Sequence, residues 1–330
     1  MNPILTIILC LIVVNIFIRT FKKIKIPYVI SLILSGIIIG GIFKDYIIQG
    51  NESIIIILGD LGIFFLMFVA GLNSSKKMLK TEEHDSLFIS LFAMLFPFLL
   101  SFLIMPILGY SKITAVIIGI CMSITAEATN VEILLNNKKL KTKLGSVIVE
   151  AGIIDDVLGI VVFILLSLFL GNSTIKDIII MILVLMSFFF GLYMQRIKHY
   201  KVVSKVEHSL NHYLIPFFFI SMGLNFKLDA LWTDPLLLVF VVCIAIIGKL
   251  GGTLLAKFFV KLKIKQLYLI GWAMNSRGVV GLILAFIAFN TGLISLKIYS
   301  VLIIMAFTTT LIFPFVISLM IKSDKNIMNE

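Results

Sequence analysis

The sequence predicts an all-α, polytopic membrane protein, and three observations carry this prediction. Hydrophobic residues make up 60% of the 330 residues while charged residues make up 14%, and the mean hydropathy is +1.15. Apolar runs of about 20 residues recur along the whole chain, which is the length that one helix needs to cross a bilayer. Basic residues are concentrated in every second connection between these runs. A soluble protein with a wetted surface does not have this composition.

Eleven segments have the length and composition of spanning helices. We expect them at 3–21, 27–43, 54–72, 86–108, 113–135, 144–170, 175–195, 209–225, 235–260, 266–290 and 296–320, with boundaries uncertain by about 2 to 4 residues. The first segment is followed by further spans and not by a cleavage site of small residues. We therefore expect it to be a membrane helix of the mature protein and not a removed signal peptide. We therefore expect residues 1–330 to form a single integral membrane domain without a soluble domain.

The net charge of +11 reflects topology. Lys and Arg cluster after the odd-numbered spans, at 19–25, 76–80, 138–143, 196–205, 257–265 and 322–325, whereas the other connections hold few basic residues. Because basic loops remain on the cytoplasmic side, the N-terminus is expected outside and the C-terminus in the cytoplasm of a cell membrane. The basic excess also attracts anionic lipid headgroups, and no nucleic-acid partner is expected.

Two adjacent acids, Asp155 and Asp156, lie inside the apolar segment 144–170. An ionised side chain at membrane depth costs roughly 2.5 to 3.5 kcal/mol even on the milder insertion scales, so a pair of acids requires a compensating role. The usual role is to bind a cation or to carry a proton. The pair is therefore the candidate functional centre.

Other charged residues are expected at the same depth as this pair. Counted at about 1.5 Å per residue, the two acids lie roughly 16 Å from the cytoplasmic start of their helix, near the middle of a layer about 30 Å thick. Glu127, Lys249 and Arg277 also fall close to mid-depth in their own spans. Because acids outnumber bases within the spans, the site favours cations over anions.

Two further acids, Glu132 and Glu150, lie nearer the cytoplasmic side. They could line a cytoplasmic funnel that leads to the site, or they could be solvated residues at helix ends. The sequence leaves both interpretations open.

Two spans contain polar inserts at the depth of the charges. The inserts occupy 121–130 and 275–278, and their polar residues are Thr125, Glu127, Thr129, Asn130, Asn275, Ser276 and Arg277. Irregular backbone at membrane depth persists only where protein or a wet cavity surrounds it. The two spans run in opposite directions, which predicts an inverted repeat with two discontinuous helices that cross near the midplane. Glu127 would offset the partial positive charge of the exposed helix N-termini there. Lys249 or Arg277 would offset the partial negative charge of the C-termini.

At these residues the chain resembles a known family. The matching segments are GIIDDVLG at 152–159, FFISMG at 218–223, IGKLG at 247–251 and NSRGVVGL at 275–282. A Pro-led second span at 27–41 and the segment LGDLGIFFLMFVAGL at 58–72 are similar too, so the likeness covers nearly the whole chain. They resemble the monovalent cation:proton antiporters, specifically the second branch with sodium:proton antiporters of the NhaA type. One span separates the helix of the acids from the 218–223 segment, so the chain is about two helices shorter than many relatives.

This resemblance implies an NhaA-like antiporter fold, residue roles and partners. Asp156 would bind the ion and exchange it for protons, and Asp155 would form a salt bridge with Lys249. The transported ions would be H⁺ and Na⁺ or Li⁺, with K⁺ as a further candidate, held by Asp156 and Asp155. The protein would work by alternating access as a homodimer in a lipid bilayer, without a cofactor and without enzymatic chemistry.

Two other functions compete with this interpretation. A sodium-coupled solute symporter on the same scaffold would need a larger polar cavity, and a lysine facing the acids argues against it. An intramembrane aspartic protease needs two carboxylates from different helices around one water molecule. Asp155 and Asp156 instead lie about 100° apart on one helix.

Overall fold

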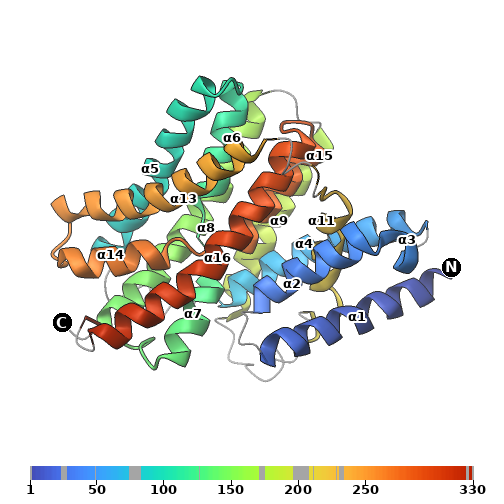
Figure 1. Ribbon diagram of the computed structural model, residues 1–330, viewed down its shortest axis with the longest axis horizontal. Coiled ribbons are helices and arrows are strands. Elements are labelled where there is room, and N and C mark those ends of the chain that lie inside the picture. The colour runs from blue at the N-terminus through green and yellow to red at the C-terminus, as the bar shows by residue number, and fades with distance from the viewer. Residues whose placement is uncertain are drawn as a thin grey trace. The chain divides into compact units, whose positions relative to one another are not determined.

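The computed structural model is helical throughout its described part, which comprises residues 2–23, 28–48, 50–73, 83–125, 127–170, 175–195, 208–210, 212–227, 229, 234–324 and 327–328. No strand occurs in these ranges. The elements are α1 (Pro3–Lys23), α2 (Tyr28–Gly36), the π-helix η1 (Ile37–Ile42), α3 (Lys44–Ile47), α4 (Glu52–Asn73), α5 (Glu83–Ile107), α6 (Lys112–Ser123), α7 (Glu127–Asn136), α8 (Lys143–Leu170), α9 (Ile175–Gln195), α11 (Ile215–Leu224), α13 (Pro235–Leu255), the 3₁₀ turn η2 (Ala256–Phe258), α14 (Ile264–Ala273), α15 (Val279–Asn290) and α16 (Leu296–Ser323). Figure 1 shows them in order from blue to red.

The all-α prediction is confirmed, since each of the eleven expected segments is occupied by helix in the described residues. Five helices among these residues are long and apolar enough to cross a membrane as single rods, and four shorter apolar helices accompany them. Two of the short helices, Lys112–Ser123 and Val280–Asn290, lie in the two expected spans that are broken, and a third, Tyr28–Ile42, comprises α2 and η1 of the second span. Parts of the basic loops, at 24–27, 74–82 and 196–207, lie outside the described residues.

The chain divides into two compact units. The first comprises Met1–Ser75 and Ile179–Leu228, and in it α11 packs on α2, η1 and α4. The contact between α2 and α11 is made by backbone: a methyl group on Gly36 would collide with the carbonyl oxygen of Phe219, and one on Gly223 with that of Gly36. Such small-residue contacts are how apolar helices approach closely in a membrane.

The second unit comprises Lys76–Ile178 and Asp229–Glu330 and contains both broken spans. Helix α5 packs along α6, α8 and α13, and α16 contacts α13, α14 and α15, which it passes diagonally in Figure 1. Glycines bring α13 against α5, because a methyl group on Gly248 would overlap Pro97 and one on Gly252 would overlap the backbone of Phe92. Lys249 lies between these two glycines, so the close approach also places its side chain.

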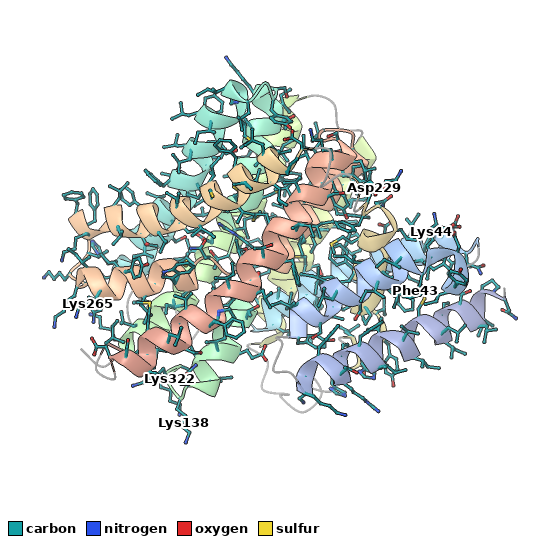
Figure 2. All side chains as sticks on the ribbon, viewed as in Figure 1. Phe43, Lys44, Lys138, Asp229, Lys265 and Lys322 are labelled. Atoms are coloured by element: carbon teal, nitrogen blue, oxygen red, sulfur yellow. The ribbon has the colours of Figure 1, made fainter. Side chains whose placement is uncertain are left out.

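The helix ends of the second unit fall into two groups. Tyr110, Asp234 and Lys297 lie together at the end where α6, α13 and α16 begin. At the other end, Lys265 at the start of α14 lines a hollow with Ser323 at the end of α16, and Figure 2 shows Lys138, Lys265 and Lys322 toward that end. The alternation of helix direction that the basic loops predict is therefore present in this unit.

The glycine contact in the first unit leads to a stability prediction. Gly223→Ala should lower the thermal unfolding temperature, because the added methyl group meets backbone atoms of α2 that cannot move aside, and overpacking costs about 1 to 3 kcal/mol. The matched control is Gly41→Ala, since a methyl group there would come no closer than 3.5 Å to its nearest neighbour, the Gly223 oxygen. Equal unfolding temperatures for the two variants would contradict the close approach of α2 and α11.

Candidate functional site

The two polar inserts are breaks between half-helices, as predicted. Helix α6 ends at Ser123, Ile124 is extended (φ −80°, ψ 139°), and α7 begins at Glu127. Helix α14 ends at Ala273, and Gly278 is extended (φ −96°, ψ 175°) before α15 begins. The breaks touch, because the hydroxyl group of Thr125 lies 3.3 Å from the carbonyl oxygen of Met274. Two discontinuous helices therefore cross inside the second unit.

Two cations cap the C-terminal end of α6 at this crossing. The ammonium group of Lys249 donates to the carbonyl of Ser123, and the guanidinium group of Arg277 donates to the carbonyls of Met122 and Ile124. Both cations are buried. The last carbonyl groups of a helix have no partner within the helix and carry partial negative charge, so cations stabilise them. This geometry matches the compensating role expected for Lys249 and Arg277.

Asp155 on α8 accepts three hydrogen bonds from three different elements. Lys249 of α13 donates to Oδ2 at 2.7 Å, and Thr125 in the α6–α7 break donates to the same oxygen at 2.7 Å. Ser90 of α5 donates to Oδ1 at 2.5 Å. Asp155, Lys249, Thr125 and Ser90 are all completely buried. The carboxylate is thus well compensated, which a buried charge requires.

Sequence reasoning missed Ser90, because a serine inside an apolar helix carries no charge signal. A signal was nevertheless present. Helix α5 contains Ser86 four residues before Ser90, which puts both hydroxyl groups on one helix face. A polar stripe on an apolar helix indicates a polar partner.

Asp156, the second acid of the pair, is 5% exposed and follows Asp155 directly on α8. Two other predicted residues of the break, Thr129 and Asn130 in the first turn of α7, are 1% exposed. Their side-chain oxygen and nitrogen atoms have no hydrogen-bond partner within the described part of the chain. Such orphaned groups normally bind water or an ion. The side chain of Glu127 lies outside the described residues, although its backbone position at the start of α7 is the one expected for an acid that offsets a helix N-terminus.

In the second break, the side chains of Ser276 and Asn275 donate hydrogen bonds to carbonyl groups at the end of α14. Ser276 donates to the carbonyl of Ala273 at 2.9 Å, and Asn275 donates to that of Gly271 at 3.0 Å. Their role in this structure is to replace helix hydrogen bonds that the break removes.

The two acids considered for a cytoplasmic funnel have different environments. Glu150 is 1% exposed and accepts a hydrogen bond of 2.8 Å from Ser86 of α5, whereas Glu132 on α7 is exposed. Glu150 therefore lies inside the unit and not on an open wall. The same face of α5 serves Glu150 and Asp155 through Ser86 and Ser90.

Tyr110, Asp234 and Lys297 form a further polar cluster, which sequence reasoning did not find. It lies at the end of the second unit where α6, α13 and α16 begin. Asp234 accepts from Lys297 at 2.7 Å and from Tyr110 at 2.8 Å, and it caps α13 by accepting from the amide of Leu237 at 3.0 Å. The bond from Lys297, followed by that from Leu237, lowers the pKa of Asp234 to about 2. The acid is therefore ionised at neutral pH and ties the starts of α13 and α16 to the α5–α6 turn.

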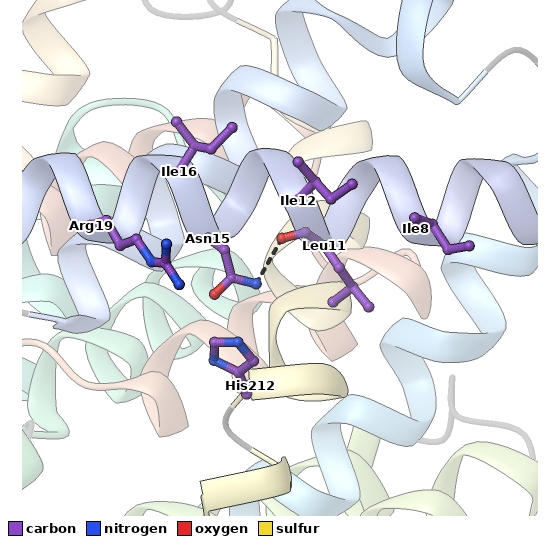
Figure 3. A pocket seen from close by; sticks show the side chains of 7 residues that line it. All are labelled: Ile8, Leu11, Ile12, Asn15, Ile16, Arg19 and His212. Carbon is purple, nitrogen blue, oxygen red and sulfur yellow. Dashed lines mark hydrogen bonds between the residues drawn. The ribbon is translucent and has the colours of Figure 1, made fainter.

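The hollow in the first unit does not suit a cation. Its volume is about 360 Å³, and Figure 3 shows Asn15, Arg19 and His212 among apolar residues of α1. Asn15 is engaged with the carbonyl of Leu11 at 2.8 Å. No acid lines this hollow, and no group of three or more His, Cys, Asp or Glu residues able to hold a metal ion occurs in the described ranges. The acids around the crossing breaks remain the candidate cation site.

Comparison with known proteins gives a consistent family assignment. The family model for the sodium/hydrogen exchanger, transmembrane, matches residues 4–197 and 183–323. The chain is 26% identical over 377 aligned residues to a Na(+)/H(+) antiporter of Enterococcus hirae, covering 96% of this chain and 97% of the relative. It is 23% identical over 344 residues to the Na(+)/H(+)-K(+) antiporter GerN of Bacillus cereus, and the alignment covers 87% of this chain and 88% of the relative.

The fold is shared with a solved structure. The sodium proton antiporter MjNhaP1 from Methanocaldococcus jannaschii superposes with a TM-score of 0.71 and 17% sequence identity, covering 97% of this chain and 96% of that one. The two ranges matched by the family model overlap at residues 183–197, which begin inside α9, the span between the acids and the 218–223 segment. This is the region in which the sequence predicts about two helices fewer than in many relatives.

The buried ion pair leads to a second prediction. Asp155→Asn and Lys249→Ala should each lower the thermal unfolding temperature of the purified protein, because removing one partner leaves the other charge uncompensated at a cost of about 3 to 5 kcal/mol. The loss of stability in the double variant should be smaller than the sum of the losses in the two single variants. As a control, Glu132→Gln combined with Lys249→Ala should give additive losses, since Glu132 is exposed. Additive losses for the Asp155 and Lys249 variants would show that these residues do not interact.

Proposed function

The chain belongs to the sodium/hydrogen exchanger family, and on that premise we propose that it exchanges Na⁺ or Li⁺ for H⁺ across the membrane at Asp156. It is a multi-pass membrane transporter and not an enzyme, so the intramembrane protease alternative is set aside. The single observation that carries the proposal is the environment of the acid pair. Asp155 is held by Lys249, Thr125 and Ser90 as part of the scaffold, and Asp156, which follows it on α8 and is 5% exposed, is the carboxylate that we assign to transport.

The mechanism follows from competition at one carboxylate. A cation and a proton cannot both occupy Asp156, so binding of one releases the other. Around it, Asp155 and the two capping cations hold the crossing breaks in a fixed electrostatic arrangement. We propose that Thr129 and Asn130, whose polar atoms have no hydrogen-bond partner among the described residues, supply neutral oxygen ligands that replace part of the water shell of the ion. Oxygen ligands suit a hard cation such as Na⁺.

Several further features are part of the proposal. The basic loops support an external N-terminus and a cytoplasmic C-terminus in a cell membrane. Alternating access would move the second unit, which holds the acids, between the two sides. The family resemblance supports a homodimer. K⁺ is a further candidate cation, since the GerN relative is a Na(+)/H(+)-K(+) antiporter.

A sodium-coupled solute symporter remains the competing transporter function. The hollow beside Arg277 in the α15–α16 region measures about 10 Å³, which holds one water molecule at most and no organic solute. Proton flux driven by Na⁺ alone in reconstituted vesicles would distinguish the exchanger from the symporter, because the symporter would require its solute.

The assignment of Asp156 predicts a loss of transport. Asp156→Asn should reduce Na⁺-driven proton flux in proteoliposomes to less than about a tenth of the wild-type value, because the amide is nearly isosteric but cannot ionise. Folded protein should still be recovered from the membrane. Glu132→Gln, which neutralises an exposed acid of the same unit, should leave the flux unchanged. A greater residual flux in the Asp156 variant would remove this residue from the carrier role.

Competition also predicts the pH dependence of transport. The apparent KM for Na⁺ should rise as the pH falls, because protons then occupy the carboxylate that the cation needs. The measurement is initial exchange rate against Na⁺ concentration at several pH values. A KM that is constant between about pH 6 and 9, with only the maximal rate changing, would instead indicate a separate regulatory proton site, and His208 and His212 would be examined first.

A further inference from the structure

A hollow lies between the start of α14 and the end of α16 in the second unit. Its volume is about 450 Å³, which is within the range of about 300 to 1,000 Å³ that is typical of sites for small ligands. Ile264, Lys265 and Tyr268 of α14 line one side, and Met320 and Ser323 of α16 line the other. The proposed cation site uses none of these residues, so the hollow requires an explanation of its own.

The walls of this hollow are held by hydrogen bonds. The side chain of Gln266 is 4% exposed, and its oxygen accepts from the amide of Lys263 at 2.8 Å. Its nitrogen lies 3.5 Å from the carbonyl oxygen of Ile327, a buried residue that follows α16 and also lines the hollow. Lys257 donates to the carbonyl of Leu262 at 2.8 Å and so fixes the turn before α14. The hollow is therefore a formed feature of the fold.

Positive charge is concentrated at this end of the second unit. Lys265 lines the hollow, Lys263 precedes α14 as its N-cap residue, and Lys322 lies in the last turn of α16. Figure 2 shows Lys265 and Lys322 toward the same end. Asp324 also lines the hollow and offsets one of the three charges. The N-terminus of α14 adds partial positive charge, so an anionic group is the ligand that this end attracts.

Apolar side chains beside these lysines face outward. Phe258 is 83% exposed and Ile264 is 64% exposed, and Phe259 and Tyr268 are exposed as well. Ile264 and Tyr268 are four residues apart, so they lie on one face of α14. In a membrane protein, such an apolar face next to lysines lies where hydrocarbon meets the lipid headgroups. A ligand that suits this hollow therefore combines an anionic group with an apolar chain.

We propose that the hollow between α14 and α16 binds one anionic phospholipid. The phosphate group lies at Lys265, and the first part of an acyl chain lies along Tyr268 and Met320 before it continues into the bilayer. Basic pockets between membrane helices on the cytoplasmic side characteristically hold such headgroups, and the orientation proposed above makes this end cytoplasmic. The charge surplus and the adjoining apolar face together favour a lipid over a free anion.

A lipid in this position would connect two helices that both reach the crossing breaks. Helix α14 ends next to Met274, whose carbonyl oxygen lies 3.3 Å from the hydroxyl group of Thr125. Thr310 of α16 accepts from the amide of Arg277 at 3.0 Å. Holding α14 against α16 should therefore stabilise the second unit. The inference requires a membrane location and does not depend on the exchange of Na⁺ for H⁺.

Thermal unfolding of the purified protein in detergent tests the inference with three probes. Dioleoyl phosphatidylglycerol should raise the unfolding temperature by about 2 °C or more relative to dioleoyl phosphatidylcholine, because a ligand that binds only the folded protein stabilises it. Inorganic phosphate at the same concentration should give no such rise. Equal effects of the two lipids would overturn the inference, and so would a full rise with phosphate alone.

A pair of charge reversals locates the lipid. Lys265→Glu should remove at least half of the rise that is specific to phosphatidylglycerol, because it reverses the charge that lines the hollow. Lys138→Glu makes the same change at the same end but outside the hollow, and it should keep the rise. Lys265→Gln replaces the first variant if that variant does not fold. An undiminished rise in the Lys265 variant, or an equal loss in both variants, would overturn the inference.

Native mass spectrometry gives an independent count of bound lipid. The wild-type protein should retain one phosphatidylglycerol molecule more than the Lys265 variant, and the Lys138 variant should match the wild type. Identical counts in all three proteins would contradict a site at this hollow. Neither measurement requires ion transport, so failure of the lipid site and failure of the proposed exchange are distinguishable results.

Discussion

The end of α6 is the constraint on which the rest of the second unit depends. A helix that stops in the middle of a membrane leaves several carbonyl groups without partners, in a medium where each costs several kcal/mol. Lys249 of α13 and Arg277 of the α14–α15 break satisfy three of these carbonyls. Once two cations are buried to cap a helix, an acid is needed to balance them, and Asp155 supplies it through Lys249. The acid pair is therefore part of the same charge balance as the broken helix.

Close helix packing makes this balance geometrically possible. Lys249 reaches the break because Gly248 and Gly252 let α13 approach α5 to the distance of backbone contact. Arg277 also donates to the carbonyl of Ala245 on α13 at 2.8 Å, so the same helix holds both cations. The site is thus assembled from α5, α6, α8, α13 and the α14–α15 break, and a shift of any of these elements would change the electrostatics at the acids.

Under the proposed function, the site separates a fixed charge on Asp155 from an exchangeable one on Asp156. Asp155 is surrounded by donors from three elements, which makes its charge part of the scaffold. The proposed exchange at Asp156 then takes place beside a constant electrostatic background. The cluster of Tyr110, Asp234 and Lys297 fixes the opposite end of α13 and α16, so these long helices are anchored where they begin as well as at the site. Such pre-organisation is what an exchanger that must bind and release quickly requires.

The sequence by itself determined the helical class, the positions of the spans and the two breaks, because hydrophobic length and buried charge are local properties of the chain. It also singled out the acid pair, Lys249 and Arg277. Only the tertiary structure decided which groups meet. In the sequence, Ser86 and Ser90 form only a short polar stripe on an apolar helix, which does not say which groups they meet. Their partners, and those of Asp234, arise from the packing of α5, α8, α13 and α16. Likewise, Glu150 and Glu132 look alike in sequence, and packing alone buries one and exposes the other.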